Sequence, residues 1–194
     1  MNRRISIGIF VGGKGTRMGG VAKGLLRTPD GSESLIERLL RQCAHAVPGA
    51  TLFLIGRAPP YAALNLPHLN DDPSDVGPIG GLRALLLHAR ADGSELALAL
   101  ACDLPFLDEA VISTLVTPFS GTTRVPFVEQ RLQPLAAAYA PVAALRAVDR
   151  SLALGKHALM HVLEQLGPEL ERVEFDDARA RALRDWDTPE DMLR

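Results

Sequence analysis

The sequence of 194 residues is poor in several residue types, and each shortage excludes a class of protein. It has only two cysteines, Cys43 and Cys102, which lie far apart and match no zinc-binding or redox spacing. Two cysteines in a chain of this length do not form a disulfide scaffold, so we expect a reducing, cytoplasmic location. No apolar run reaches the roughly 18–20 residues that a membrane-spanning helix needs. The net charge of −2 offers no basic field, so neither nucleic acid nor a membrane is expected as a partner.

Lysine is also scarce, with three residues against eighteen arginines. Two of the three, Lys14 and Lys23, fall in the stretch "VGGKGTRMGGVAKGLL", which also holds six glycines. Lysine presents a compact point charge to a phosphate, and glycine lets backbone N–H groups approach an anion closely. The stretch therefore predicts an anion-binding loop, directly after an apolar run.

The first half of the chain alternates between apolar runs and amphipathic stretches. Three runs, at Ile5–Val11, Thr51–Ile55 and Leu96–Ala101, have the nearly continuous apolar character of strands covered on both faces. The stretches Ser34–Val47 and Gly81–Ala91 carry apolar residues at helical spacing. This alternation predicts parallel βαβ units with right-handed crossovers.

The pattern loosens after Pro105. Thr122–Val128 and Arg131–Ala140 predict a strand pair, and helices follow from about Val142 to Leu166. Because neither a repeat nor a linker is present, we predict one α/β domain over residues 1–194. It would be a single Rossmann-like domain with a mostly parallel central sheet, helices on both faces and an embellished C-terminal half.

Two common types of phosphate loop do not fit the glycine-rich stretch. A Walker A loop needs Gly-Lys-Ser/Thr, which the sequence lacks. The dinucleotide fingerprint G-x-G-x-x-G fits at Gly13 and Gly15, but Met18 occupies the third glycine position. What remains is Gly-Gly-x-x-x-Arg-Met-Gly and a lysine four residues later, at Gly12, Gly13, Arg17, Met18, Gly19 and Lys23.

This spacing resembles the signature loop of nucleotidyltransferases, and "GGKGTRMGGVAKGLL" is most similar to the molybdenum cofactor guanylyltransferase (MobA-type) family. The resemblance implies catalytic roles for Arg17 and Lys23. It also implies nucleotide contacts from Phe10, Val11, Gly12, Gly13, Arg17 and Lys23. Two departures are visible, since Ala22 stands where the family usually has an acidic residue and Phe10-Val11 where it usually has Leu-Ala. The second departure leaves guanine specificity more open than triphosphate binding.

The segment "DDPSDVGPIGGL" is similar to the family's acidic segment that leads into a helix through Gly-Pro. By the resemblance, Asp72, Gly77 and Pro78 would contact the nucleotide. From the residues alone, Gly77-Pro78 makes a turn, and Gly80-Gly81 would let backbone approach a ligand at a helix start. A plain helix-entry turn with solvated aspartates is the other reading.

The stretch "LALACDLPFL" takes an apolar strand into Asp103, a carboxylate beside the predicted phosphate loop. Carboxylate oxygens are the ligands that Mg²⁺ needs when it bridges a triphosphate. In the family the matching aspartate holds the metal, which implies that Asp103 is a catalytic, nucleotide-binding and metal-binding residue. The alternative is an aspartate that caps the next helix. Cys102 is interpreted as core packing.

Near the end of the sequence, "RDWDTPEDM" is similar to a polar-x-polar-Thr-Pro-Glu element of the family that lies near the metal. The resemblance implies that Asp187 contacts the metal, directly or indirectly. It implies a smaller role in metal contact for Asp185. In an extended segment, these two carboxylates would lie on one face because they are two residues apart.

The acceptor-facing half of the family has a segment similar to "RLQPLAAAY". Arg131 suits a phosphate and Gln133 a planar heterocycle, although both could be ordinary polar residues of a strand. We also expect Lys156, at a Gly-rich helix junction, to contact the acceptor.

Together these features predict a Mg²⁺-dependent transfer of GMP from GTP to molybdopterin. The half of the chain from about residue 1 to 107 would bind the nucleotide. The half from about 108 to 194 would bind the acceptor. Alternatives are a CTP-dependent enzyme for molybdopterin, a nucleotidyltransferase for sugar or polyol phosphates, and a nucleotide-binding accessory module without turnover. Molybdoenzyme-assembly proteins are candidate partners of the chain.

Overall fold

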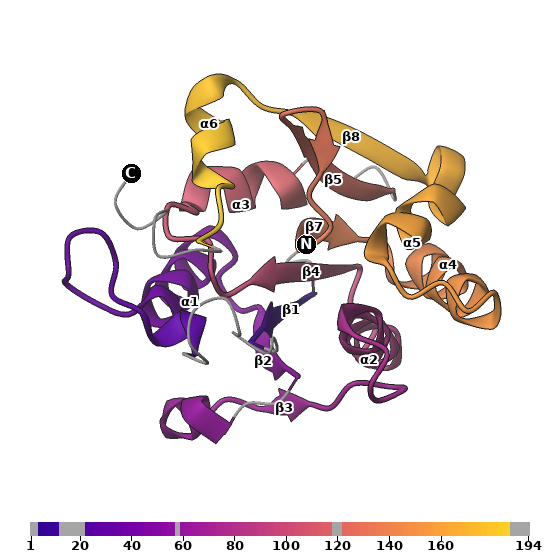
Figure 1. Cartoon of the computed structure of the whole chain (residues 1–194), viewed down its shortest axis with the longest axis horizontal. Coiled ribbons are helices and arrows are strands. Elements are labelled where there is room, and N and C mark those ends of the chain that lie inside the picture. Colours follow the sequence, from indigo (N-terminus) through magenta and orange to yellow (C-terminus); the bar gives the residue numbers. More distant parts are fainter. Residues whose placement is uncertain (1–3, 12–21, 57–58, 118–121, 187–194) are drawn as a thin grey trace.

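A computed structural model describes residues 4–11, 22–56, 59–117 and 122–186, which form an eight-stranded sheet with helices packed against it (Figure 1). The strands are β1 (Ile5–Phe10), β2 (Thr51–Ile55), β3 (His68–Leu69), β4 (Leu96–Ala101), β5 (Thr123–Val128), β6 (Arg131–Leu132), β7 (Ala136–Tyr139) and β8 (Leu170–Glu174). The helices are α1 (Leu35–Ala46), α2 (Pro78–Ala91), α3 (Glu109–Val116), α4 (Pro141–Ala153), α5 (Leu159–Leu166) and α6 (Asp177–Ala182). Short 3₁₀ turns are η2 (Lys23–Leu25), η3 (Pro59–Leu64) and η4 (Gly167–Glu169).

The strand order is β3-β2-β1-β4-β7-β5-β6, and β8 pairs with β5. The pairs β1–β2, β1–β4, β2–β3 and β5–β8 are parallel, whereas β4–β7, β5–β7 and β5–β6 are antiparallel. This confirms the predicted Rossmann-like fold with a mostly parallel sheet. The sheet continues from one predicted half of the chain into the other.

Strand β1 is buried throughout and apolar apart from Ser6, because both of its faces are covered. Ile5, Ile7 and Ile9 belong to the core that contains α1 and α3, and Phe10 belongs to the core that contains α2, α4 and α5. A Cβ on Gly8 would lie 2.7 Å from a terminal methyl of Leu85, so glycine lets α2 pack closely on the strand. Figure 1 shows α2, α4 and α5 as one group of helices and α1 and α3 as another.

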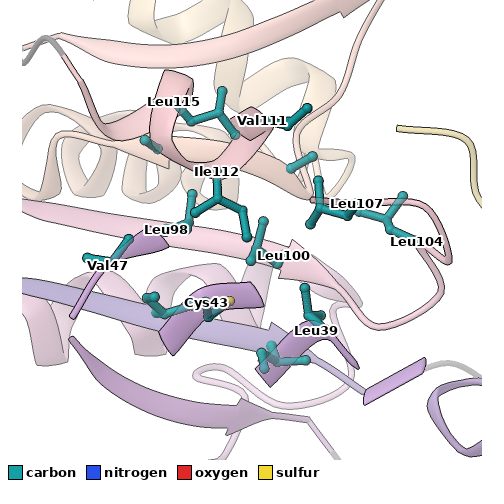
Figure 2. Packing of buried hydrophobic residues seen from close by; sticks show 14 of the residues in the cluster. Leu39, Cys43, Val47, Leu98, Leu100, Leu104, Leu107, Val111, Ile112 and Leu115 are labelled. Carbon is teal, nitrogen blue, oxygen red and sulfur yellow. The ribbon is translucent and has the colours of Figure 1, made fainter. Parts of the chain in front are cut away.

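The first of these cores is drawn in Figure 2, where α1 and α3 meet side chains of β4. Its labelled members are Leu39, Cys43 and Val47 near α1, Leu98 and Leu100 on β4, and Leu104, Leu107, Val111, Ile112 and Leu115 at α3 and the loop before it. Helix α1 starts where its sequence predicts, because Ser34 and Glu37 form a reciprocal capping box.

Several elements differ from the sequence-based prediction. Helix α2 begins at Pro78 rather than at Gly81, with Gly77 at its N-cap in a left-handed conformation (φ 79°). The region Arg131–Ala140 forms two short strands, β6 and β7, instead of one. The sequence-based prediction did not include β3, β8 or α6, and it gave no residue range for the helix after Asp103 that became α3. In the part of the chain that the structure describes, no helix has the length and apolar character required to span a membrane.

Candidate active site

A cavity of about 300 Å³ lies at the carboxyl ends of β1 and β4, where ligands bind in open α/β sheets. Segments that are far apart in the sequence line it. They contribute Phe10 and Val11, Ala22 and Lys23, Ala101 to Leu104, Gln133 to Ala136, Leu159, Leu183 and Asp185.

Backbone hydrogen bonds hold the walls of this cavity together. The Cys102 N–H donates to the Phe10 carbonyl at 3.2 Å, which joins the ends of β4 and β1. The Ala101 N–H donates to the Leu135 carbonyl at 2.7 Å. The Trp186 N–H donates to the Asp103 carbonyl at 3.0 Å, so the segment after α6 is attached to the end of β4.

Lys23 and Asp103 form an ion pair in the cavity. The Lys23 Nζ lies 2.8 Å from Asp103 Oδ2, and the two side chains are only 19% and 17% exposed. Lys23 is carried by η2 and Asp103 follows β4, so the pair joins residues 80 positions apart. A charge-assisted hydrogen bond of this length holds both groups in place inside the cavity.

Asp103 is not the cap of the following helix. Asp108 occupies the N-cap of α3, and its side chain accepts a hydrogen bond from the Val111 N–H at 2.9 Å. This leaves the Asp103 carboxylate facing Lys23. The neighbouring Cys102 belongs to the buried core, and burial raises the pKa of its thiol to about 12, which argues against a nucleophilic role.

Asp185 and Gln133 line the same cavity as Lys23 and Asp103. The two carboxylates, of Asp103 and Asp185, supply the oxygen ligands that Mg²⁺ takes from proteins, which commonly give only one or two in addition to substrate phosphates. The donor set therefore fits Mg²⁺. No cluster of three or more histidine, cysteine or acidic side chains suited to a metal occurs among the described residues. The predicted ligand Asp187 lies outside them.

Arg131 and Lys156 do not line the cavity that holds Lys23. Arg131 borders a neighbouring cavity that shares Gln133, Leu183 and Asp185 with the first, so the two are contiguous. Lys156 is exposed in the connection between α4 and α5. The predicted loop residues Gly12, Gly13 and Arg17 lie outside the described part of the chain.

Asp72 lies before α2, and its carboxylate binds Arg83 with an oxygen–nitrogen distance of 2.6 Å. Arg83 also donates to Asp149 of α4 at 2.7 Å, so it connects the Asp72 segment to two helices. Asp71 is more buried, and desolvation raises the pKa of its carboxyl group. Gly77 and Pro78 start α2 and, like Asp72, do not line the Lys23 cavity.

The glycines that follow have a packing role that the sequence did not predict. A Cβ on Gly80 would lie 2.3 Å from the Pro73 carbonyl oxygen, and one on Gly81 would lie 2.5 Å from a side-chain carbon of Ile55. Both glycines therefore let α2 approach other parts of the protein, and the backbone there is not open to a ligand.

Sequence reasoning missed three residues that support the site: Arg83, Tyr61 and Trp186. The Tyr61 hydroxyl accepts a hydrogen bond from the Gly24 N–H, next to Lys23. Trp186 is 3% exposed and packs edge-on against Phe106, with 6.3 Å between ring centroids. For Tyr61 and Trp186 the available signal was rarity, since the chain has two tyrosines and one tryptophan, whereas Arg83 is one of eighteen arginines and gave no such signal.

Comparison with known proteins identifies the class of this site. Residues 7–173 match the family described as the MobA-like NTP transferase domain. A molybdenum cofactor guanylyltransferase of Pseudomonas syringae pv. syringae is 31% identical over 178 residues, which cover 90% of this chain and 86% of that one. A probable molybdenum cofactor guanylyltransferase of Methanosarcina mazei is 26% identical and covers 95% of this chain and 86% of its own.

Solved structures agree on the fold. The molybdopterin-guanine dinucleotide biosynthesis protein A of Archaeoglobus fulgidus has a TM-score of 0.76 at 22% identity, covering 97% of this chain and 95% of its own. The 2-C-methyl-D-erythritol 4-phosphate cytidylyltransferase of Thermus thermophilus has a TM-score of 0.66 at 16% identity, covering 96% and 94%. The chain is thus an enzyme of the nucleotidyltransferase class. It belongs to the MobA-like NTP transferase family.

Proposed function

We propose that this nucleotidyltransferase transfers GMP from GTP to the phosphate of molybdopterin, giving molybdopterin guanine dinucleotide and pyrophosphate. The observation that carries the proposal is the Lys23–Asp103 ion pair of 2.8 Å, placed in a cavity at the ends of the parallel strands. The names of relatives that align over most of the chain support the choice of GTP and molybdopterin.

The reaction needs no nucleophile from the enzyme. An oxygen of the acceptor phosphate attacks the α-phosphorus of GTP in line, the bond from that phosphorus to the bridging oxygen breaks, and pyrophosphate leaves with the electron pair. Catalysis then consists of positioning and of charge stabilisation. The Lys23 ammonium group would offset the charge that develops on the α-phosphate and pyrophosphate, together with Arg17 from the glycine-rich loop.

The remaining residues bind and orient the two substrates. The backbone of Gly12 and Gly13 would hold the nucleotide, together with Phe10 and Val11 at the carboxyl end of β1. Gln133 would hydrogen-bond the pterin heterocycle, because its amide both donates and accepts. Arg131, in the contiguous cavity, would bind an acceptor phosphate.

Mg²⁺ is proposed as the cofactor, with Asp103 and Asp185 as its ligands and Asp187 as a further one. When bound, it supplies positive charge to the phosphate oxygens. Before Mg²⁺ binds, the ion pair with Lys23 balances the negative charge of the Asp103 carboxylate and holds this group in place.

A second candidate is a cytidylyltransferase, which would act on molybdopterin or on a polyol phosphate. The sequence Phe10-Val11, at a position that the resemblance puts near the base, departs from the Leu-Ala that the guanylyltransferase family usually has there and so leaves this candidate open. The alternative of a module without turnover is disfavoured, because the chain belongs to an enzyme family.

The test measures pyrophosphate release with each of GTP, CTP and ATP, in the presence of Mg²⁺ and of either molybdopterin or a polyol phosphate. We expect turnover with GTP and molybdopterin only, and tighter binding of GTP than of CTP or ATP in isothermal titration. A preference for CTP would overturn the guanine assignment and leave the reaction class intact. Loss of turnover with a chelator, restored by added Mg²⁺, tests the cofactor.

A further inference from the structure

A buried tyrosine contacts the chain neighbour of Lys23. Tyr61 comes from η3, between β2 and β3, and is only 2% exposed. Its hydroxyl oxygen accepts a hydrogen bond from the Gly24 N–H at 3.1 Å. The ring packs so close that a Cβ on Gly24 would lie 3.0 Å from both a ring carbon and the hydroxyl oxygen.

The Cys102 side chain lies against the same glycine, since a Cβ on Gly24 would lie 3.3 Å from the Cβ of Cys102. Tyr61 and Cys102 therefore meet at Gly24. Two residues at this junction, Gly24 and Cys102, are each the chain neighbour of one member of the ion pair. Gly24 follows Lys23, and Cys102 precedes Asp103.

We propose that Tyr61 is a positioning residue, whose hydroxyl binds the η2 turn where that turn packs on Cys102 at the end of β4, and which thereby sets the distance between Lys23 and Asp103. Tyr61 itself touches no reacting atom. The contribution of Tyr61 to turnover rests on the function proposed above. Its hydrogen bond to the η2 turn does not depend on that function.

Two physical arguments support this role. A tyrosine ring has few rotatable bonds, so a buried ring whose hydroxyl is hydrogen-bonded can fix the place of a neighbouring segment at little entropic cost. The ring also borders a second cavity, of about 420 Å³, lined in part by Pro59, Ala62 and Leu66. That space would let the ring shift once its hydrogen bond was lost.

The decisive variant is Tyr61→Phe, which keeps the ring and removes only the hydroxyl. We expect kcat for pyrophosphate release from GTP and molybdopterin to fall by about tenfold, because small misplacements of charged groups are costly in catalysis. The KM for GTP should stay within about threefold, since binding contacts made equally in ground and transition states are retained. Amide exchange at Gly24, followed by NMR, should become about tenfold faster because its acceptor is gone.

The matched control is Ser6→Ala, which removes another buried hydroxyl bond, to Ser94 at 2.9 Å, on β1 ahead of the residues that line the cavity. It should lower stability comparably and leave kcat unchanged. If Tyr61→Phe does not fold, Gly24→Ala provides a second test, because its Cβ would press on the Tyr61 ring.

An unchanged kcat, or a raised KM for GTP with unchanged kcat, would overturn the proposal. Unchanged protection of the Gly24 amide in Tyr61→Phe would also overturn it. If the parent does not turn over GTP with molybdopterin, the proposed function fails, and the exchange rate at Gly24 still decides whether Tyr61 holds the η2 turn.

Discussion

The two sides of β4 are built differently. On one side, β1, β2 and β3 are joined by parallel pairs, and on the other, β7, β5 and β6 are joined by antiparallel ones. The parallel side carries the charged pair, since Lys23 lies after β1 and Asp103 after β4. The antiparallel side reaches the same cavity through Gln133, which precedes β7. The segment after α6 adds Asp185 at the junction of the two sides.

This difference indicates that the two sides of the sheet have different roles in the reaction. Parallel strands end at one edge of a sheet, so groups that follow them in sequence meet there. An antiparallel pair reaches that edge through a turn, and its polar residues border the cavity from the opposite wall. We therefore expect changes on the parallel side to reduce the chemical step and changes on the other side to weaken acceptor binding.

The largest effect is expected for Asp103→Asn, which keeps the size of the side chain and removes its charge. Turnover should fall by about a thousandfold, because charge that stabilises the transition state is lost. The affinity for GTP should fall only about tenfold, or roughly 1.4 kcal/mol. Pyrophosphate release at several Mg²⁺ concentrations and isothermal titration measure the two quantities.

Asp108→Asn is the matched control for this change, because it removes a charge at the N-cap of α3, where asparagine caps equally well. Its turnover should equal that of the parent. Parent-like turnover of Asp103→Asn at low Mg²⁺ would instead move the metal site to Asp185 and Asp187.

Lys23→Ala should lower turnover by at least about a hundredfold, the scale of losing one preorganised charge donor. Lys23→Met separates charge from bulk and should be as slow, while Lys23→Arg should recover part of the rate. Turnover of Lys23→Ala within a few-fold of the parent would show that this side chain does not stabilise the transition state. It would then contradict the assignment of the chemical step to the parallel side.

Trp186→Ala tests the junction between the two sides, because the buried ring packs on Phe106 and anchors the segment whose backbone N–H donates to the Asp103 carbonyl. Removing this buried ring should reduce the free energy of unfolding by about 3 kcal/mol, as for other large-to-small core substitutions. We also expect turnover to fall about tenfold at temperatures where the variant is folded, because Asp185 loses its support. Denaturant unfolding and steady-state kinetics measure both, and Trp186→Phe should restore most of each.

The smallest effect is expected for Gln133→Ala on the antiparallel side. The KM for molybdopterin should rise about fivefold, the equivalent of one modest hydrogen bond. The affinity for GTP should not change, and neither quantity should change in the control Gln165→Ala on α5. Weaker GTP binding by Gln133→Ala would contradict the assignment of this wall to the acceptor.

Much of the parallel side could be predicted from the sequence. The apolar runs that became β1, β2 and β4 were clear because strands covered on both faces need apolar residues throughout. Lys23 stood out by the scarcity of lysine, and Asp103 by its place after an apolar strand. The strands beyond β4 were harder to predict, because β6 has only two residues and β8 carries charged residues such as Glu171 and Arg172.

The sequence by itself determined which side chains could carry charge to a phosphate, because that depends on residue type and on position after a strand. Only the tertiary structure decided what supports them. Lys23 meets Asp103 across 80 positions, Tyr61 binds the chain neighbour of Lys23, and Asp72 is bound by Arg83. Such contacts join segments through packing in three dimensions, and no local pattern of spacing encodes them.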